Sequence, residues 1–180
     1  DVLGSRGLGD VYKRQSLGSI VKGMGTSEFL IHIVEQYLTP GMVPALVFLF
    51  GALISFSTGS SWGVWSIMMP IAFPMAVAFD ISIPFVVGAV IGGGLFGDQC
   101  SPISDTTVLS STGASCNHIV HVMTQIPYGI TVGISAFVGF LFGGLTGQYV
   151  LSIAVTAAIL TVSLFTLTQL TKRRYPEKVH

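Results

Sequence analysis

Residues 97–106 read GDQCSPISDT and directly follow the apolar run VVGAVIGGGLF at residues 86–96. Two aspartates, Asp98 and Asp105, therefore stand next to a long apolar sequence. No lysine or arginine occurs anywhere in residues 23–171. A buried carboxylate needs a counter-charge or hydrogen-bond donors. The partner of these acids must therefore be a proton, a metal cation, a histidine or backbone amides.

The whole chain has the composition of a membrane protein. Of its 180 residues, 51% are hydrophobic and only 9% are charged, which favours a polytopic, all-α membrane protein. The apolar body has no basic patch and so gives no indication of a nucleic-acid partner. Neither Cys100 nor Cys116 has the ligand spacing of a metal or redox site, so we interpret both as small thiols. No cofactor is expected.

The two ends of the chain differ from the apolar body. Residues 1–15 fit nothing that follows them, and their last part, DVYKRQ, resembles a translated transposon end used in preparing sequencing libraries, so we expect a non-native head. Residues 16–40 are predicted to form an amphipathic helix. Residues 41–171 form the predicted transmembrane domain. The basic tail at residues 172–180 is expected in the cytoplasm by the positive-inside rule.

Polar segments interrupt the apolar stretches of the transmembrane domain. Residues 42–56 and 84–96 fall short of the roughly 20 residues that a straight helix needs to cross a bilayer. The residues from Asp105 onward offer about three helical turns. We expect such half-helices to meet in broken or re-entrant segments, because irregular backbone at membrane depth is tolerated only beside protein or water. Longer helices are predicted at residues 62–79, 127–145 and 149–171.

The segment around residues 97–107 is dense in oxygen ligands, with a proline that prevents a continuous helix. Its candidate residues are Asp98, Ser101, Pro102, Ser104, Asp105, Thr106 and Thr107. Carboxylate, hydroxyl and carbonyl oxygens hold small hard cations such as Na⁺, and desolvation disfavours an ionised carboxylate. We therefore predict that Asp98 and Asp105 alternate between Na⁺ and a proton. In a purely structural alternative, Asp98 ends one helix in water and Asp105, beside Ser104, caps the next.

A second polar break, STGSSWG at residues 57–63, offers hydroxyls and flexible backbone without charge. Its candidate ion ligands are Thr58, Ser60 and Ser61, and its candidate gating or structural residues are Gly59 and Gly63. We expect this break to face the aspartate segment across one site.

Two histidines, His118 and His121, follow with a His-x-x-His spacing. No third ligand is spaced to complete a metal site, so we interpret them as gating or structural residues. The break at residues 57–63 also contains a G-x-S-x-G pattern centred on Ser61. An intramembrane serine protease that uses Ser61 with His118 or His121 is therefore an alternative function.

Three segments, in order, carry a resemblance to a known family: FSTGSSWGVWSIMMPIAFP, GGGLFGDQCSPISDTT and CNHIVHVMTQIPYG. Over residues 16–171 the chain resembles the C-terminal half of NhaC-type Na⁺/H⁺ antiporters, a family that includes a malate/lactate antiporter. This implies one half of an inverted-repeat transporter of the bacterial inner membrane, partnered by a missing N-terminal half, and leaves a homodimer open. It also implies Na⁺/H⁺ exchange, or organic-anion exchange on the same scaffold, with Ser104, Asp105 and Thr106 at a hairpin tip.

Overall fold

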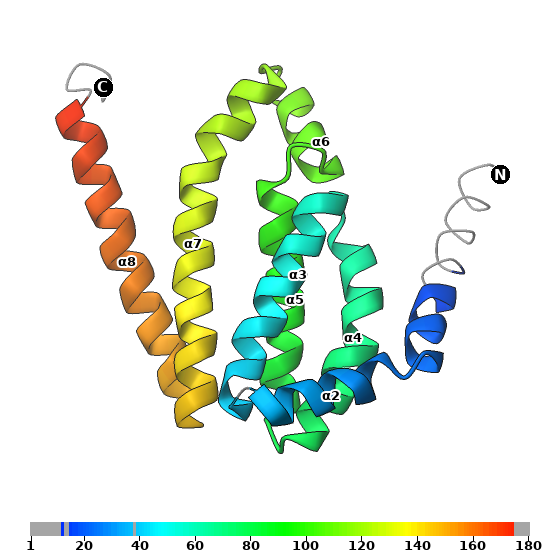
Figure 1. The fold of residues 1–180 in the computed structure, drawn as a ribbon. Helices are drawn as coiled ribbons and strands as arrows, with labels where there is room; N and C mark the ends of the chain where they lie inside the picture. The colour runs from blue at the N-terminus through cyan, green and yellow to red at the C-terminus, as the bar shows by residue number, and fades with distance from the viewer. Residues whose placement is uncertain (1–11, 13–14, 38, 175–180) are drawn as a thin grey trace.

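The computed structural model describes residues 12, 15–37 and 39–174 (Figure 1). The expected head lies almost entirely outside the described residues, as do residues 175–180 of the tail. The described part is helical between short turns and contains no strand. Its elements are α2 (Thr26–Tyr37), the 3₁₀ helix η1 (Pro40–Met42), α3 (Val43–Thr58), α4 (Ser61–Ala78), α5 (Ile83–Cys100), α6 (Asp105–Gly113), α7 (His118–Thr146) and α8 (Tyr149–Arg174).

Five helical segments of the described chain are long and apolar enough to cross a membrane. They are Pro40–Thr58, Ser61–Ala78, Ile83–Cys100, His118–Thr146 and Tyr149–Gln169. The prediction of an all-α, polytopic membrane protein is therefore confirmed. The prediction that residues 42–56 and 84–96 are too short to cross is wrong, because both apolar runs belong to longer helices.

Helices α3 and α5 continue past their apolar runs for different reasons. At the end of α3, the hydroxyls of Ser57 and Thr58 donate to carbonyls one turn back in the same helix, at 2.8 and 2.9 Å. In α5, the glycine triplet and Gly97 pack against α3 instead of ending the helix. The 18 residues of α5 make a helix of about 27 Å, close to the hydrocarbon thickness of a bilayer, about 30 Å. Re-entrant geometry and an inverted repeat remain predictions.

Among the described elements, α3 and α5 form the most extensive helix–helix contact, and they pack backbone against backbone. A methyl group at Gly93 would collide with the carbonyl oxygen of Phe48, and one at Gly97 would collide with that of Ala52. The buried Ser55 hydroxyl also donates to the carbonyl oxygen of Gly94, at 2.6 Å. Glycine is required at these positions because any side chain would separate the helices.

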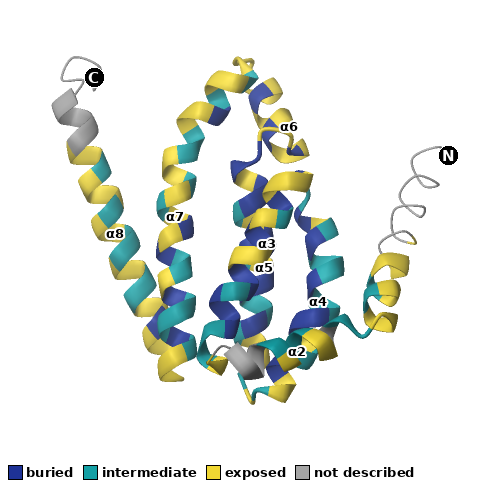
Figure 2. Ribbon diagram, in the orientation of Figure 1, coloured by how far each residue is buried: buried dark blue, intermediate teal, exposed yellow. Residues whose placement is uncertain are grey.

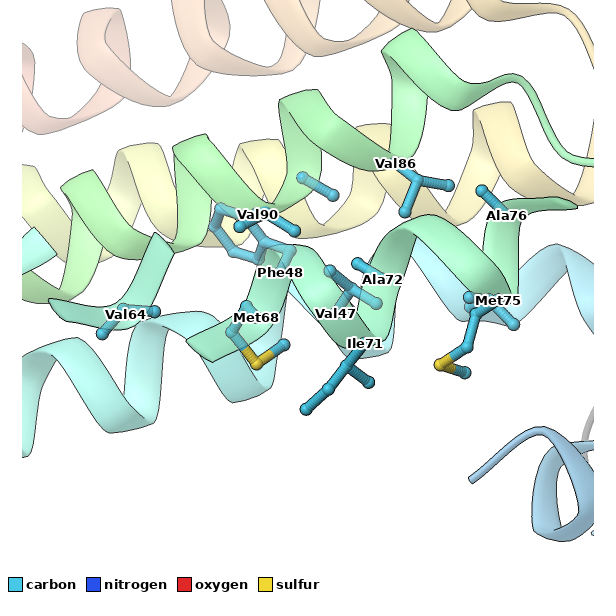
Figure 3. Packing of buried hydrophobic residues seen from close by; sticks show 12 residues of the cluster. Val47, Phe48, Val64, Met68, Ile71, Ala72, Met75, Ala76, Val86 and Val90 are labelled. Atoms are coloured by element: carbon cyan, nitrogen blue, oxygen red, sulfur yellow. The ribbon is translucent and has the colours of Figure 1, made fainter. Parts of the chain in front are cut away.

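The hydrophobic core lies where α4 covers this pair. Figure 3 shows Val64, Met68 and Ala72 of α4 beside Val47 and Val90 of the neighbouring helices. Figure 2 shows the buried residues concentrated on α3, α4 and α5, whereas α8 is mostly exposed or partly exposed and packs on α7. A helix this exposed and apolar suits contact with lipid.

Three other element boundaries differ from the sequence prediction. The expected helix at residues 16–40 is divided into a helix at residues 15–23 and α2, because Gly25 adopts a left-handed conformation with φ 65°. The helix expected from residue 127 begins at His118, and Pro127 lies inside it. The helix expected to end at residue 171 continues to Arg174.

The order of the helices brings the two polar breaks to one end of the molecule. In Figure 1, α3 rises, α4 returns, and α5 rises again beside α3. The turn after α3, the turn after α5, the short helix α6 and the start of α7 therefore gather at the top, while α2 crosses the opposite end.

Candidate functional site

The turn between α3 and α4 lies directly against the turn between α5 and α6. Ser101 donates its hydroxyl to the carbonyl oxygen of Phe56 at 2.8 Å. Gly59 is left-handed, with φ 65°, and a methyl group on it would lie 2.8 Å from the carbonyl oxygen of Ile103. The two polar breaks therefore lie in contact, and the expectation that they share one ion site stays a prediction.

This contact gives a testable prediction for Gly59→Ala. The change forces a side chain into a left-handed conformation, which costs about 1–2 kcal/mol, and presses a methyl group onto the neighbouring turn. We expect a lower thermal midpoint for the purified full-length protein in detergent, followed by tryptophan fluorescence. Gly63→Ala is the control, since its nearest neighbour would be the Ser60 hydroxyl at 3.8 Å. Equal midpoints for the two variants would contradict this account of the turn.

Asp98 is the centre of the candidate site. It belongs to the last turn of α5 and is 4% exposed. The sequence placed it in a broken segment between two helices, whereas the structure shows it as a helical residue. The Ser104 hydroxyl bonds to Asp98 Oδ1 at 2.8 Å, and the Thr106 hydroxyl bonds to Asp98 Oδ2 at 3.2 Å. The two hydroxyl oxygens are 2.7 Å from each other. Three side chains thus form a closed ring of oxygen contacts.

Hydrogen counting shows what this ring requires. Two of the three contacts, at 2.7 and 2.8 Å, have the usual length of a hydrogen bond between oxygens, and the third, at 3.2 Å, is longer. The hydroxyls of Ser104 and Thr106 supply one hydrogen each. With Asp98 ionised, one contact would bring two oxygens together with no hydrogen between them. A proton on Asp98 completes the ring, because each of the three groups then donates once and accepts at least once. The ring therefore has a place for a proton on Asp98.

The same residues fix the start of α6. Ser104 is its N-cap and accepts a hydrogen bond from the backbone amide of Thr106 at 3.2 Å. Asp105 is the first helical residue, so the alternative that made Asp105 itself the cap is wrong. The Asp105 side chain is exposed and its carboxylate makes no hydrogen bond within the described residues. The negative charge of Asp105 lies in the first turn of α6, where the positive end of the helix dipole stabilises it.

The structure does not join the hydroxyls of the α3–α4 turn to Asp98. Thr58 donates to the carbonyl oxygen of Ile54 in its own helix, at 2.9 Å. Ser60 caps α4 by accepting from the amide of Gly63 at 3.5 Å. Ser61 is buried at the start of α4. These residues shape the turn that supports the α5–α6 turn, and their role as ion ligands stays a prediction.

His118 links three elements at the edge of the site. Its Nε2 lies 2.7 Å from the carbonyl oxygen of Pro102, which can only accept, so Nε2 carries a hydrogen. Its Nδ1 lies 3.1 Å from the hydroxyl of Ser111 on α6. His118 thereby ties the start of α7 to both the α5–α6 turn and α6. Within the described residues neither ring nitrogen bonds to Ser61, so the pairing that a serine protease needs is not formed.

His121 lies on the first turn of the same helix, where its backbone amide bonds to Asn117. No group of three or more His, Cys, Asp and Glu side chains lies together in the described part of the chain.

Two features of this region were not predicted from the sequence. Gln125 of α7 donates to both the backbone and side-chain oxygens of Gln99, at 2.8 and 3.0 Å, and holds α7 beside the end of α5. Ser111 faces inward and is buried. The spacing of Ser104, Thr107 and Ser111, three and four residues apart, is a sequence signal that could have identified Ser111 as part of a buried helix face.

Comparison with known proteins identifies the family. The sequence model described as the Na⁺/H⁺ antiporter family matches residues 15–145, a range that contains every candidate site residue. An uncharacterized protein of Haemophilus influenzae is 43% identical over 83% of this chain. The malate-2H⁺/Na⁺-lactate antiporter of Bacillus subtilis is 29% identical over 78% of the chain. An uncharacterized Na⁺/H⁺ antiporter of Haemophilus influenzae is 30% identical over 71%.

The chain spans only 29%, 32% and 27% of the length of these three relatives, respectively. No solved structure matches it. Because the family model covers most of the sequence, the chain belongs to the Na⁺/H⁺ antiporter family.

Proposed function

We propose that this chain forms part of a secondary transporter that exchanges Na⁺ for protons, and that Asp98 binds the two ions alternately. The observation that carries the proposal is the ring in which the buried carboxylate of Asp98 meets the hydroxyls of Ser104 and Thr106, with a place for one further proton. A group that is buried and needs a proton to complete its hydrogen bonds is suited to releasing and rebinding one.

Na⁺ could replace that proton at the same oxygens. When the hydroxyl hydrogens of Ser104 and Thr106 turn away, lone pairs of both hydroxyls and the charge of Asp98 become available to a cation. No lysine or arginine occurs in residues 23–171 to neutralise the carboxylate permanently. In this proposal a proton or a Na⁺ ion balances the charge of Asp98, and competition between the two ions couples their fluxes.

The proposal places the transporter in the bacterial inner membrane with residues 172–180 in the cytoplasm. The chain corresponds to only part of its relatives, so further ligands to Na⁺ would come from the rest of the full-length protein. Asp105, on the exposed side of α6, is suited to face that remaining part.

A Na⁺-coupled or proton-coupled exchanger of organic anions is the second candidate, favoured by the similarity to the malate-2H⁺/Na⁺-lactate antiporter. In this chain, an anionic substrate would have to bind at a helix N-terminus, because the transmembrane domain has no cationic side chain. The start of α6 carries Asp105 in its first turn. That negative charge opposes a substrate carboxylate, so the geometry favours Na⁺/H⁺ exchange.

Transport by the full-length protein in liposomes separates the two candidates. An outward Na⁺ gradient should drive protons inward, measured with an entrapped pH-sensitive dye, without any organic anion present. Proton movement that required malate or lactate in addition to Na⁺ would contradict the proposal and support the second candidate. Protein-free liposomes provide the background.

A further inference from the structure

One face of α6 is buried and carries only hydroxyl side chains. Ser104, which caps the helix, Thr107 and Ser111 are 0%, 2% and 2% exposed, whereas the other residues of α6 are exposed. Figure 2 shows this contrast on α6, with dark blue positions between yellow ones. Residues three and four apart lie on one side of a helix, so the three hydroxyls form a row. A buried row of this kind is unusual, since most buried helix faces are apolar.

Thr107 is the unexplained member of this row. Its hydroxyl is buried and has no hydrogen-bond partner among the described residues. Other hydroxyls of the same helix are bonded: Ser110 and Thr112 donate to carbonyl oxygens one turn back, each at 2.8 Å. Buried hydroxyls in folded proteins are almost always partnered, and an exception calls for a water or an ion.

Both ends of the row lead to titratable groups. Ser104 bonds to Asp98 at 2.8 Å, and Ser111 lies 3.1 Å from His118 Nδ1. Between the ends, neighbouring positions of the row are separated by about 5–6 Å at their Cβ atoms. Within the described residues, the Thr107 hydroxyl is bonded to neither neighbour of the row, and one water that bonds to both hydroxyls would bridge each gap.

We propose that the buried face of α6 is a hydrated path between Asp98 and His118, in which Thr107 is a positioning residue for the waters. This inference rests on the proposed function of Asp98. It gives protons a second approach to the carboxylate of that residue. The first approach is through Thr106, which is exposed and bonds to the opposite carboxylate oxygen. The two oxygens of the Asp98 carboxylate thus contact different hydroxyls, Ser104 on the path and Thr106 on the exposed side of α6.

Substitution of Thr107 tests the path in the full-length transporter. Thr107→Val keeps the shape of the side chain and removes the hydroxyl. The loss of one hydrogen bond along the path should lower the maximal rate of Na⁺-driven proton movement about tenfold. The half-saturating Na⁺ concentration should stay unchanged, because Thr107 does not contact Asp98. Thr107→Ser should restore the rate, and Thr112→Val, on the exposed side of α6, should leave it unaltered.

A wild-type rate for Thr107→Val, together with loss of exchange in Asp98→Asn, would overturn the path and leave the proposed function intact. Exchange that survives in Asp98→Asn would instead overturn the proposed function. A fall in rate that Thr107→Ser fails to restore would also overturn the path, because it would indicate a packing effect.

Chemical access provides a second measurement that does not depend on transport rates. In a full-length background with Cys100→Ala and Cys116→Ala, and with any other cysteines likewise replaced, Thr107→Cys should react with a small water-soluble methanethiosulfonate. Val90→Cys, a fully buried core position on α5, should not react. Equal protection of both cysteines in folded protein would overturn the hydrated path.

Discussion

Asp98→Asn should reduce Na⁺-dependent proton movement to the background of protein-free liposomes. Asparagine keeps the size of the side chain and its ability to bond to Ser104 and Thr106. It has no proton to release, however, and no charge to attract Na⁺. The change therefore removes the exchange chemistry and preserves the packing at the end of α5, which the same elution profile in size-exclusion chromatography would verify.

Two other aspartates serve as comparisons for this variant. Asp80 lies exposed in the turn before α5 with a left-handed φ of 52°, a conformation that asparagine tolerates, so Asp80→Asn should transport like the wild type. Asp105→Asn should retain exchange but need more Na⁺ for half-saturation, because Asp105 lies outside the hydrogen-bonded ring. Full exchange by Asp98→Asn combined with loss in Asp105→Asn would assign the carrier role to Asp105 instead.

Gly97→Ala should produce the largest loss of stability. The added methyl group would collide with the carbonyl oxygen of Ala52 and lie 2.7 Å from the amide nitrogen of Phe56. Both are backbone atoms of α3 and cannot move aside without moving the helix. Overpacking of this kind costs about 1–3 kcal/mol, and separation of the helices would also lengthen the bond between Ser55 and Gly94. We expect a markedly lower thermal midpoint and a smaller monodisperse fraction in detergent.

Gly88→Ala is the matched control, since it lies on the same helix and a methyl group there meets nothing within 4 Å. Alanine is favoured over glycine inside a helix by about 0.5–1 kcal/mol, so this variant should be as stable as the wild type or more so. A similar drop in both midpoints would contradict this account, because the loss of stability would then not depend on the contact with α3.

The helical class and the polar breaks could be predicted from the sequence, because both follow from composition and from the distribution of charged and polar residues along the chain. The lengths of α3 and α5 could not. Ser57, Thr58 and the glycines at 92–94 look like helix ends in isolation, since serine, threonine and glycine favour turns. Their helical state depends on hydroxyl-to-carbonyl bonds within α3 and on close packing between α3 and α5, and neither interaction is visible in a single sequence.

The residues of the candidate site could be predicted from the sequence, but their arrangement in space could be predicted only in part. The absence of lysine and arginine from residues 23–171 indicates that Asp98 and Asp105 need unusual partners. This absence does not show which of the two acids is buried and which is exposed. Their different positions follow from the α5–α6 turn, which brings Ser104 and Thr106 to the buried Asp98 and leaves Asp105 on the exposed side of α6. The buried hydroxyl row depends on the same turn.

The glycine contact between α3 and α5 has a mechanical consequence. Helices that interlock through side chains can slide past each other when those side chains change rotamers. The contact at Gly93 and Gly97 has no side chains to rearrange on α5, so a shift of a fraction of a turn would be resisted by the backbones themselves. We therefore expect α3 and α5 to keep their relative position in any movement of the full-length protein, and the two polar turns at their ends to stay together.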